Sequence, residues 1–340
     1  MNIIYHYYPR FRKEIFENIA AREPKTNFIY GRNARFAIES VADERHHLQR
    51  NFYFKNLIVQ SFGLKTLKYI LSNDSVILGD LKFLNTWLYA LLGRLFGRRI
   101  LFWTHGVLEP ETGVKWILRK AYYSLAHGLL LYSKHEADIL RNLGFKKPIF
   151  VIGNANYSSA ELDSKSNLSP ASPRGLCYIG RISNDKGFSD FVRLALEYPD
   201  RKVLLIGPSL LNQSDKVKVP KNLTIVAPEY ERNSLRDLTA DCSTMIMFTP
   251  AGLSLFTAAL LGKRIVIKHV FPQKPEFHLL QAFGLIELFT SYEELQDRIE
   301  NPSVGDEQYH SARLKFLKEN SAEEVALRLL NAYTQIQGNI

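Results

Sequence analysis

The stretch Leu176–Phe188, LCYIGRISNDKGF, decides the fold of the second half of the chain. It begins with an apolar run typical of a buried strand, and apolar residues at helical spacing follow from Phe188. The polar loop between them carries Arg181 and Lys186. In open α/β sheets, ligands bind at the carboxyl ends of the strands, where this loop is expected. An arginine fork and a lysine charge suit a diphosphate, although a solvated turn with two incidental cations fits equally well.

The rest of the second half repeats this alternation of strand and helix. Apolar strands are predicted at 202–207, 223–226, 244–248 and 265–267, and helices at 234–240 and 253–261. Such a pattern predicts a parallel, doubly wound sheet. Pro250 and Gly252 precede the second helix, where free N–H groups favour an anion. Two anion-binding elements are therefore expected after two strands of one sheet.

The first half also consists of predicted βα units. Its strands are predicted at 2–5, 27–30, 51–54, 76–78, 100–103, 129–132 and 149–152, and its helices include 12–22, 64–72, 84–96 and 114–126. Residues 156–174 are rich in serine and contain two prolines, which predicts a linker. The sequence therefore predicts an N-terminal domain at 1–155, a second domain at 175–318 and a final helix within 319–340.

Charge is distributed unevenly between the two halves. The 340 residues carry a formal net charge of +10 and are 46% hydrophobic, which suits packed domains and excludes a disordered chain. Residues 1–150 contain 23 Lys and Arg against 12 Asp and Glu, whereas residues 151–340 contain 21 against 22. The excess points to an anionic partner for the first half, although a basic surface without a partner is also common. No nucleic-acid-binding motif is present, so no nucleic acid is expected.

The sequence also limits location and metal chemistry. Cys177 and Cys242 lie in or beside apolar strands, so buried thiols in a reducing compartment are expected. Neither a Cys/His metal spacing nor a DxD motif occurs. Residues 1–5 are predicted to form a strand and lack the apolar segment of a signal peptide, which favours a cytoplasmic location. The uncharged range 242–262 fits strand, loop and helix better than a membrane span.

Several motifs, in the expected order, resemble GT-B glycosyltransferases of the family 4 type that build bacterial surface polysaccharides. The loop IGRISNDKGF resembles their donor loop, and FTPAGLSLFTAALLGKRIVI is similar to their PGxxGLxxxxALxxGxPVI variant. The other matching segments are YYPRFRKEIF (7–16), WTHG (103–106), RKAYYSLAHGLLLYSKHEADILRNLGF (119–145) and VIGNANY (151–157). The resemblance implies two Rossmann-like α/β domains facing a cleft, with the C-terminal helix returning to the first domain.

The resemblance also implies a donor site in the second domain and an acceptor site in the first. The donor-binding positions it implies are Gly180, Arg181, Lys186, Gly207, Val226, Pro228, Gly252, Leu253, Ser254, Thr257 and Glu276. The resemblance implies that Arg181 and Lys186 are catalytic, because they would stabilise the negative charge of the leaving diphosphate. It also implies a catalytic role for His105; the alternative is that His105 makes only a structural hydrogen bond.

One departure from the family pattern affects the donor site. Many relatives carry two glutamates spaced E-x7-E, where this chain has Thr249 and Thr257. Glu276 is the nearby carboxylate offered in their place, although an acid at a helix N-terminus explains it equally well.

The activity implied is retaining transfer of a sugar from a UDP- or GDP-sugar to a lipid-diphosphate-linked glycan. The pathway would be synthesis of O-antigen, lipopolysaccharide, capsule or exopolysaccharide. No metal or other cofactor is expected, because Arg181 and Lys186 would replace a metal held by a DxD motif. Loss of both glutamates leaves an inactive GT-B scaffold open, and the shared fold leaves a sugar-nucleotide epimerase open.

Two segments of the first half combine aromatic and basic residues. Tyr8, Arg10, Arg12 and Lys13 are predicted to contact the acceptor or anionic lipid at the inner face of the cell membrane, as a peripheral protein would. The alternative is that these cations flank the first helix and touch only water. In the range 83–99, apolar residues at helical spacing precede three arginines. A core helix packed on the sheet is expected there in preference to a helix at a membrane interface.

Overall fold

A computed structural model describes residues 1–32, 45–163, 174–212 and 219–338 of the chain. The chain divides into two compact units. Unit 1 contains residues 1–158 and 320–340, and unit 2 contains residues 159–319. The first residues of the predicted linker thus belong to unit 1, and helix α6 (Ala160–Asp163) belongs to unit 2. Residues 164–173 of that linker lie outside the described residues.

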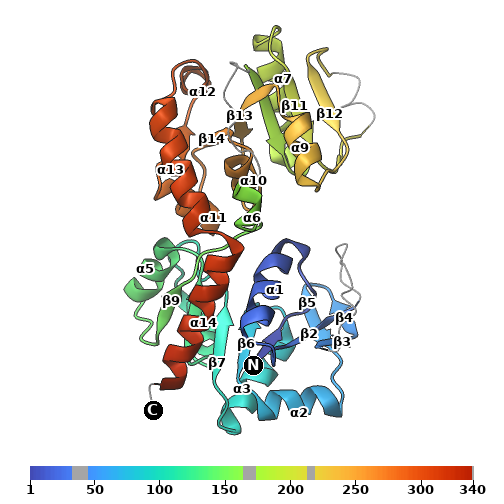
Figure 1. The fold of residues 1–340 in the computed structure, drawn as a ribbon, viewed down its shortest axis with the longest axis vertical. Coiled ribbons are helices and arrows are strands. Elements are labelled where there is room, and N and C mark those ends of the chain that lie inside the picture. The colour runs from blue at the N-terminus through green and yellow to red at the C-terminus, as the bar shows by residue number, and fades with distance from the viewer. Residues whose placement is uncertain (33–44, 164–173, 213–218, 339–340) are drawn as a thin grey trace. The chain divides into compact units, whose positions relative to one another are not determined.

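Unit 1 is built on a seven-stranded parallel sheet with the order β3-β2-β1-β6-β7-β8-β9 (Figure 1). Its strands are β1 (Asn2–Ile4), β2 (Asn27–Gly31), β3 (His46–Gln49), β6 (Ser75–Leu78), β7 (Ile100–Trp103), β8 (Gly128–Leu131) and β9 (Ile149–Val151). Its helices are η1 (Arg10–Arg12), α1 (Lys13–Arg22), α2 (Leu64–Ser72), α3 (Leu84–Leu95), α4 (Gly113–Tyr123), α5 (Lys134–Asn142) and α14 (Ala322–Gly338). The strand order reverses between β1 and β6, which makes this edge the ligand-binding switch point of the sheet.

Both faces of this sheet are covered by helices. On one face, Ile4, Ile77 and Phe102 belong to a buried apolar cluster that includes side chains of α2, α3, α4 and α5. On the other face, Phe16 of α1 packs against Phe28, with ring centroids 5.5 Å apart. Helix α14 contacts α1 and lies beside it in Figure 1. Burial on both faces explains why the strands appear in the sequence as continuous apolar runs.

The segment 51–54 forms a strand, but the predicted βα unit there is wrong. Strand β4 (Asn51–Phe54) pairs antiparallel with β5 (Leu57–Gln60) in a separate two-stranded sheet. Lys55 in the turn has a φ of 52°, the left-handed conformation that two-residue hairpin turns require. The turn lacks the Asn-Gly or Asp-Gly pair that would have indicated a hairpin.

Helix α3 packs on the sheet as predicted, but through only part of the predicted apolar stripe: Phe83 is buried and Trp87 packs against the apolar cluster. Its buried residues are Asn85, Thr86, Tyr89, Ala90 and Gly93. Leu88, Leu91 and Leu95, the leucines of the apolar stripe in the range 83–99, are exposed together with Leu84. A Cβ on Gly93 would lie 2.6 Å from Cδ1 of Ile100 in β7. Small and polar side chains therefore allow close contact with the sheet, and the leucine stripe faces outward.

Unit 2 is built on a six-stranded parallel sheet with the order β12-β11-β10-β13-β14-β15. Its strands are β10 (Gly175–Ile179), β11 (Val203–Ile206), β12 (Leu223–Val226), β13 (Cys242–Met247), β14 (Arg264–Lys268) and β15 (Ile286–Phe289). Besides α6, its helices are η2 (Asn184–Lys186), α7 (Phe188–Glu197), α9 (Arg232–Leu238), α10 (Ser254–Leu260), α11 (Pro275–Gln281), α12 (Tyr292–Glu300) and α13 (Asp306–Glu319). Here the strand order reverses between β10 and β13, so the loops after these two strands flank the switch point.

The uncharged range 242–262 forms β13, a loop and α10, as predicted. Across the described ranges, no helix combines the length and the apolar character that crossing a bilayer requires. Cys177 and Cys242 are free thiols and are buried, also as predicted.

Candidate functional site

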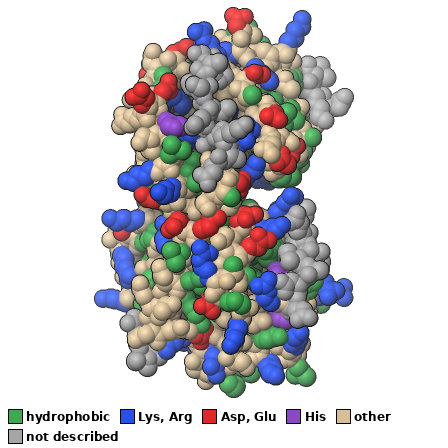
Figure 2. All heavy atoms as spheres, in the orientation of Figure 1, with side chains coloured by type: hydrophobic (Ala, Val, Ile, Leu, Met, Phe, Trp, Pro, Cys, Tyr) green, Lys and Arg blue, Asp and Glu red, His purple; other side chains and the backbone are tan. Residues whose placement is uncertain are grey.

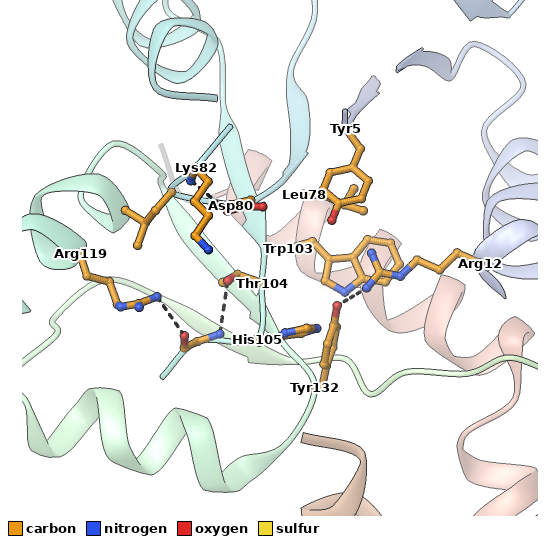
Figure 3. Close-up of a pocket in the computed structure, with 13 residues that line it drawn as sticks. Tyr5, Arg12, Leu78, Asp80, Lys82, Trp103, Thr104, His105, Arg119 and Tyr132 are labelled. Carbon is orange, nitrogen blue, oxygen red and sulfur yellow. Dashed lines mark hydrogen bonds between the residues drawn. The ribbon is translucent and has the colours of Figure 1, made fainter. Parts of the chain in front are cut away.

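Unit 1 has a cavity of about 310 Å³ at its switch point (Figure 3). Its wall consists of residues that lie at or after the ends of β1, β6, β7 and β8, and the one after β8 is Tyr132. Arg12 from η1 and Arg119 from α4 complete the wall. Asp80 and Lys82 enter from the loop after β6, and Trp103 from the end of β7. The volume lies at the lower end of the range for small-molecule sites.

Arg12 lies on the aromatic side of this cavity. Its guanidinium carbon stands 4.4 Å from the centroid of the Trp103 ring, and Nη2 donates a hydrogen bond to the hydroxyl of Tyr132. Figure 3 shows the guanidinium over the indole and beside Tyr132. Burial raises the pKa of Tyr5, on the same wall, well above its ordinary value, and the positive charge of Arg12 opposes that shift. The arginine is thus held in an aromatic cage.

The loop after β7 holds His105 at the mouth of the cavity. His105 is exposed and meets the Tyr132 ring edge-on, with centroids 4.8 Å apart. Gly106 next to it has a φ of 67°, and a Cβ there would lie 3.2 Å from Cβ of Glu136, so only glycine suits the turn. The Tyr123 hydroxyl donates to the Gly106 carbonyl at 3.0 Å and fixes the loop.

An ion pair supports the same loop from α4. Arg119 binds both carboxylate oxygens of Glu111, at 2.6 and 2.9 Å, and its Nη1 also reaches the Gly106 carbonyl at 3.5 Å. Burial opposes ionisation of Glu111, but hydrogen bonds from Arg119 and Lys115 hold the pKa of its carboxyl below its usual range. Arg119 is therefore neutralised within the protein, unlike Arg12.

The predicted lipid-contacting cluster at 7–13 is not a single surface. Tyr8 is buried, and its ring packs 5.3 Å from that of Phe16. Arg12 is also buried, because the η1 turn points it into the cavity, so its predicted contact with lipid is wrong. Arg10 is exposed, and Lys13 is half-buried, with Nζ 4.0 Å from Glu17. Only Arg10 and Lys13 remain available for a surface role.

In unit 2, the predicted diphosphate loop follows β10 at the switch point. Arg181 is exposed and Lys186 is half-buried in η2. The hydroxyl of Tyr178 donates to the Arg181 carbonyl at 2.9 Å and anchors the loop. Gly180 and Gly207 meet at the ends of neighbouring strands, because a Cβ on Gly207 would lie 1.9 Å from the Gly180 carbonyl oxygen. The loop backbone is therefore fixed, while both cations are accessible to a ligand.

The second predicted donor segment follows β13. Gly252, Leu253 and Ser254 lead into α10. Glu276, buried at the start of α11, points its carboxylate at Gly252, where a Cβ would lie 3.6 Å from Oε2. The structure thus places the Glu276 carboxylate beside the predicted loop. The spacing of Glu276 in the sequence did not show whether it would reach that loop.

Thr257 occupies the second glutamate position of the family pattern. It is buried in α10, and its hydroxyl accepts a hydrogen bond from Nη1 of Arg232 at 3.3 Å. Arg232 begins α9 and forms an ion pair with Glu161, at 3.1 Å. Arg232 could not be found from the sequence, because neither the spacing nor a motif connects α9 with α10.

Val226 and Pro228 were predicted to form the edge that contacts the nucleotide base. Val226 ends β12, and its carbonyl accepts the N–H of Gly207 at 3.1 Å. Pro228 lies exposed in the loop that follows. No cluster of three His, Cys, Asp or Glu side chains that could hold a metal ion occurs within the described ranges.

Comparisons with known proteins define the fold. No family model and no curated protein sequence matches the chain. Its structure is similar to that of HepE (Alr3699) from Anabaena in complex with UDP and glucose, at 13% identity and a TM-score of 0.62 over 98% of each chain. The α,α-trehalose-phosphate synthase (UDP-forming) from Burkholderia xenovorans gives 10% identity and 0.56 over 97% of this chain and 98% of the synthase. UDP-N-acetylglucosamine 2-epimerase from Rickettsia bellii shows 11% identity and a TM-score of 0.54 over 100% of this chain and 98% of the epimerase. The chain therefore has the GT-B fold.

Proposed function

We propose that the protein is a glycosyltransferase that moves a sugar from a nucleotide-sugar donor bound by unit 2 to an acceptor bound by unit 1. The observation that carries the proposal is the position of the two residue sets. Arg181 and Lys186 flank the switch point of the unit 2 sheet, and the aromatic cavity occupies the switch point of unit 1. The likeness to HepE along 98% of the chain supports this assignment.

The chemistry follows from the charges at the unit 2 loop. In the transfer, the bond between the anomeric carbon and the diphosphate oxygen breaks, and the acceptor oxygen bonds to that carbon and loses its proton. Arg181 and Lys186 stabilise the negative charge that develops on the leaving diphosphate. The donor is a UDP- or GDP-sugar, and UDP is favoured by the complex of HepE with UDP. Retention of anomeric configuration and independence of metal complete the proposal.

The acceptor is a lipid-diphosphate-linked glycan of bacterial surface polysaccharide synthesis, reached at the cytoplasmic face of the membrane. Helix α3, and not the segment 7–13, supplies the membrane contact. Its exposed leucines are joined by exposed cations: Arg94 in its last turn, and Lys65 and Lys68 on α2, which contacts α3. Hydrophobic and basic side chains gather at the edge of unit 1 where Figure 1 places α2 and α3 (Figure 2). Apolar stripes flanked by cations suit an anionic membrane interface.

A thermal-shift screen with UDP-, GDP-, CMP- and dTDP-sugars identifies the donor, because a ligand of the folded state raises Tm. Transfer of labelled sugar from that donor to a lipid-linked acceptor is then measured. Binding without any hydrolysis or transfer would favour an inactive scaffold and overturn the proposal.

An epimerase is the second candidate, and the likeness to the Rickettsia 2-epimerase favours it. Incubation with UDP-N-acetylglucosamine in the absence of acceptor separates the two functions. A transferase releases UDP slowly or not at all, whereas an epimerase produces the C2 epimer with the nucleotide still attached.

A further inference from the structure

The guanidinium of Arg12 is buried, and no residue of the described chain supplies it with a counter-ion. The residue is only 5% exposed, and its single hydrogen-bond partner among the described residues is the neutral hydroxyl of Tyr132. Nε is buried and makes no hydrogen bond to any described residue. No carboxylate of the described chain lies within ion-pair distance of this side chain, in contrast to Arg119, which Glu111 neutralises. Burial of a charge without a partner is costly, so a ligand that supplies the counter-charge would relieve that cost.

The surroundings of Arg12 indicate what the missing partner must be. Nε1 of Trp103 is a second buried donor that makes no hydrogen bond within the described part of the chain. Lys82 adds an exposed cation to the wall, and Asp80 adds the opposing negative charge, its carboxylate accepting the Lys82 backbone N–H at 2.9 Å. Counting the Arg119–Glu111 pair as neutral, cations outnumber anions around the cavity.

We infer that the unit 1 cavity binds the acceptor through an anionic oxygen group, a carboxylate or a phosphate, which Arg12 recognises from its aromatic cage. The guanidinium donates charge-assisted hydrogen bonds to that group, and the Trp103 and Tyr132 rings exclude water from them. A cavity of about 310 Å³ holds about one monosaccharide with its charged substituent. The inference rests on the proposed function only in calling this ligand the acceptor.

The test measures binding by calorimetry without any donor, so its outcome does not depend on sugar transfer. The probes are glucuronate for the carboxylate, glucose 6-phosphate for the phosphate and glucose as the neutral control. All measurements use an Arg181→Ala/Lys186→Ala background, which removes the competing phosphate site of unit 2. We expect one of the two anionic probes to bind at least about tenfold more tightly than glucose. The anionic probe that binds more tightly shows whether Arg12 recognises a carboxylate or a phosphate.

Arg12→Gln should abolish this preference, and Arg12→Lys should restore part of it. Lys25→Gln, which removes one exposed charge of unit 1 away from the cavity, should leave it unchanged. If Arg12→Gln does not fold, Lys82→Gln at the exposed rim is the second variant and should weaken anion binding several-fold. Equal binding of glucose and both anions by the background protein would overturn the inference, and transfer to a neutral acceptor would then leave the proposed function standing.

Discussion

Replacement of Leu91 and Leu95 by serine should detach the protein from anionic membranes. These side chains are 48% and 71% exposed on the outer face of α3, so together they present slightly more than one fully exposed leucine. Full burial of a leucine contributes about 1.5–3 kcal/mol, so the double variant should lose about 2–3 kcal/mol of membrane affinity. The partition coefficient should therefore fall by about 30- to 150-fold. Because both residues are already exposed, the free energy of unfolding should change little.

Flotation with phosphatidylserine-containing and neutral vesicles measures this partition. Leu196→Ser/Leu314→Ser is the matched control, because these leucines of unit 2 are 65% and 40% exposed and lie on other helices, α7 and α13. The reasoning is refuted if the α3 variant floats as well as the wild type, or if the control variant is equally impaired. Arg10→Ala/Lys13→Ala is a third arm, and a large loss there alone would return the contact to the segment 7–13.

Three further predictions concern the chemistry and the core. Arg181→Ala and Lys186→Ala should each lower kcat on the order of a hundredfold, whereas Arg193→Ala on the outside of α7 should not; near-normal turnover in both loop variants would remove them from the site. Transfer should persist in EDTA, and complete loss that is restored by manganese or magnesium would reveal a metal site. Burial lowers the pKa of His6 to about 4, below its unfolded value, so the unfolded state binds the extra proton between pH 6.5 and 4. The free energy of unfolding should therefore fall by about 2–3 kcal/mol from pH 7 to 4.5 in urea titrations, and His6→Phe should lack this part of the decline; equal declines in both proteins would contradict the burial argument.

The alternation of strands and helices was predictable because parallel strands buried on both faces form short apolar runs. The range 175–179 and the loop after it illustrate this. The hairpin of β4 and β5 was not predictable, because Lys55 adopts a left-handed conformation without the usual turn residues. Local sequence therefore indicated the element but not its pairing.

The candidate site divides in the same way. The loop with Arg181 and Lys186 could be predicted, because strand, glycine and cations lie next to one another in the sequence. The cavity around Arg12 could not, because it depends on Trp103 and Tyr132, which are distant in sequence and meet only where the sheet edge assembles. A buried, unpaired arginine also contradicts the usual preference of that residue for the surface. The outward position of the α3 leucines could not be predicted, because periodicity identifies an apolar stripe on a helix but does not show which helix face packs against the sheet.

The contact of α14 with α1 has a consequence for folding during synthesis. Unit 1 consists of residues 1–158 and 320–340, so the ribosome must complete all of unit 2 before the last part of unit 1 emerges. Until then, the face of α1 that α14 covers has no partner. Nascent unit 1 should therefore be a chaperone client for the time taken to translate roughly 160 residues, about 8–30 s at typical rates of synthesis.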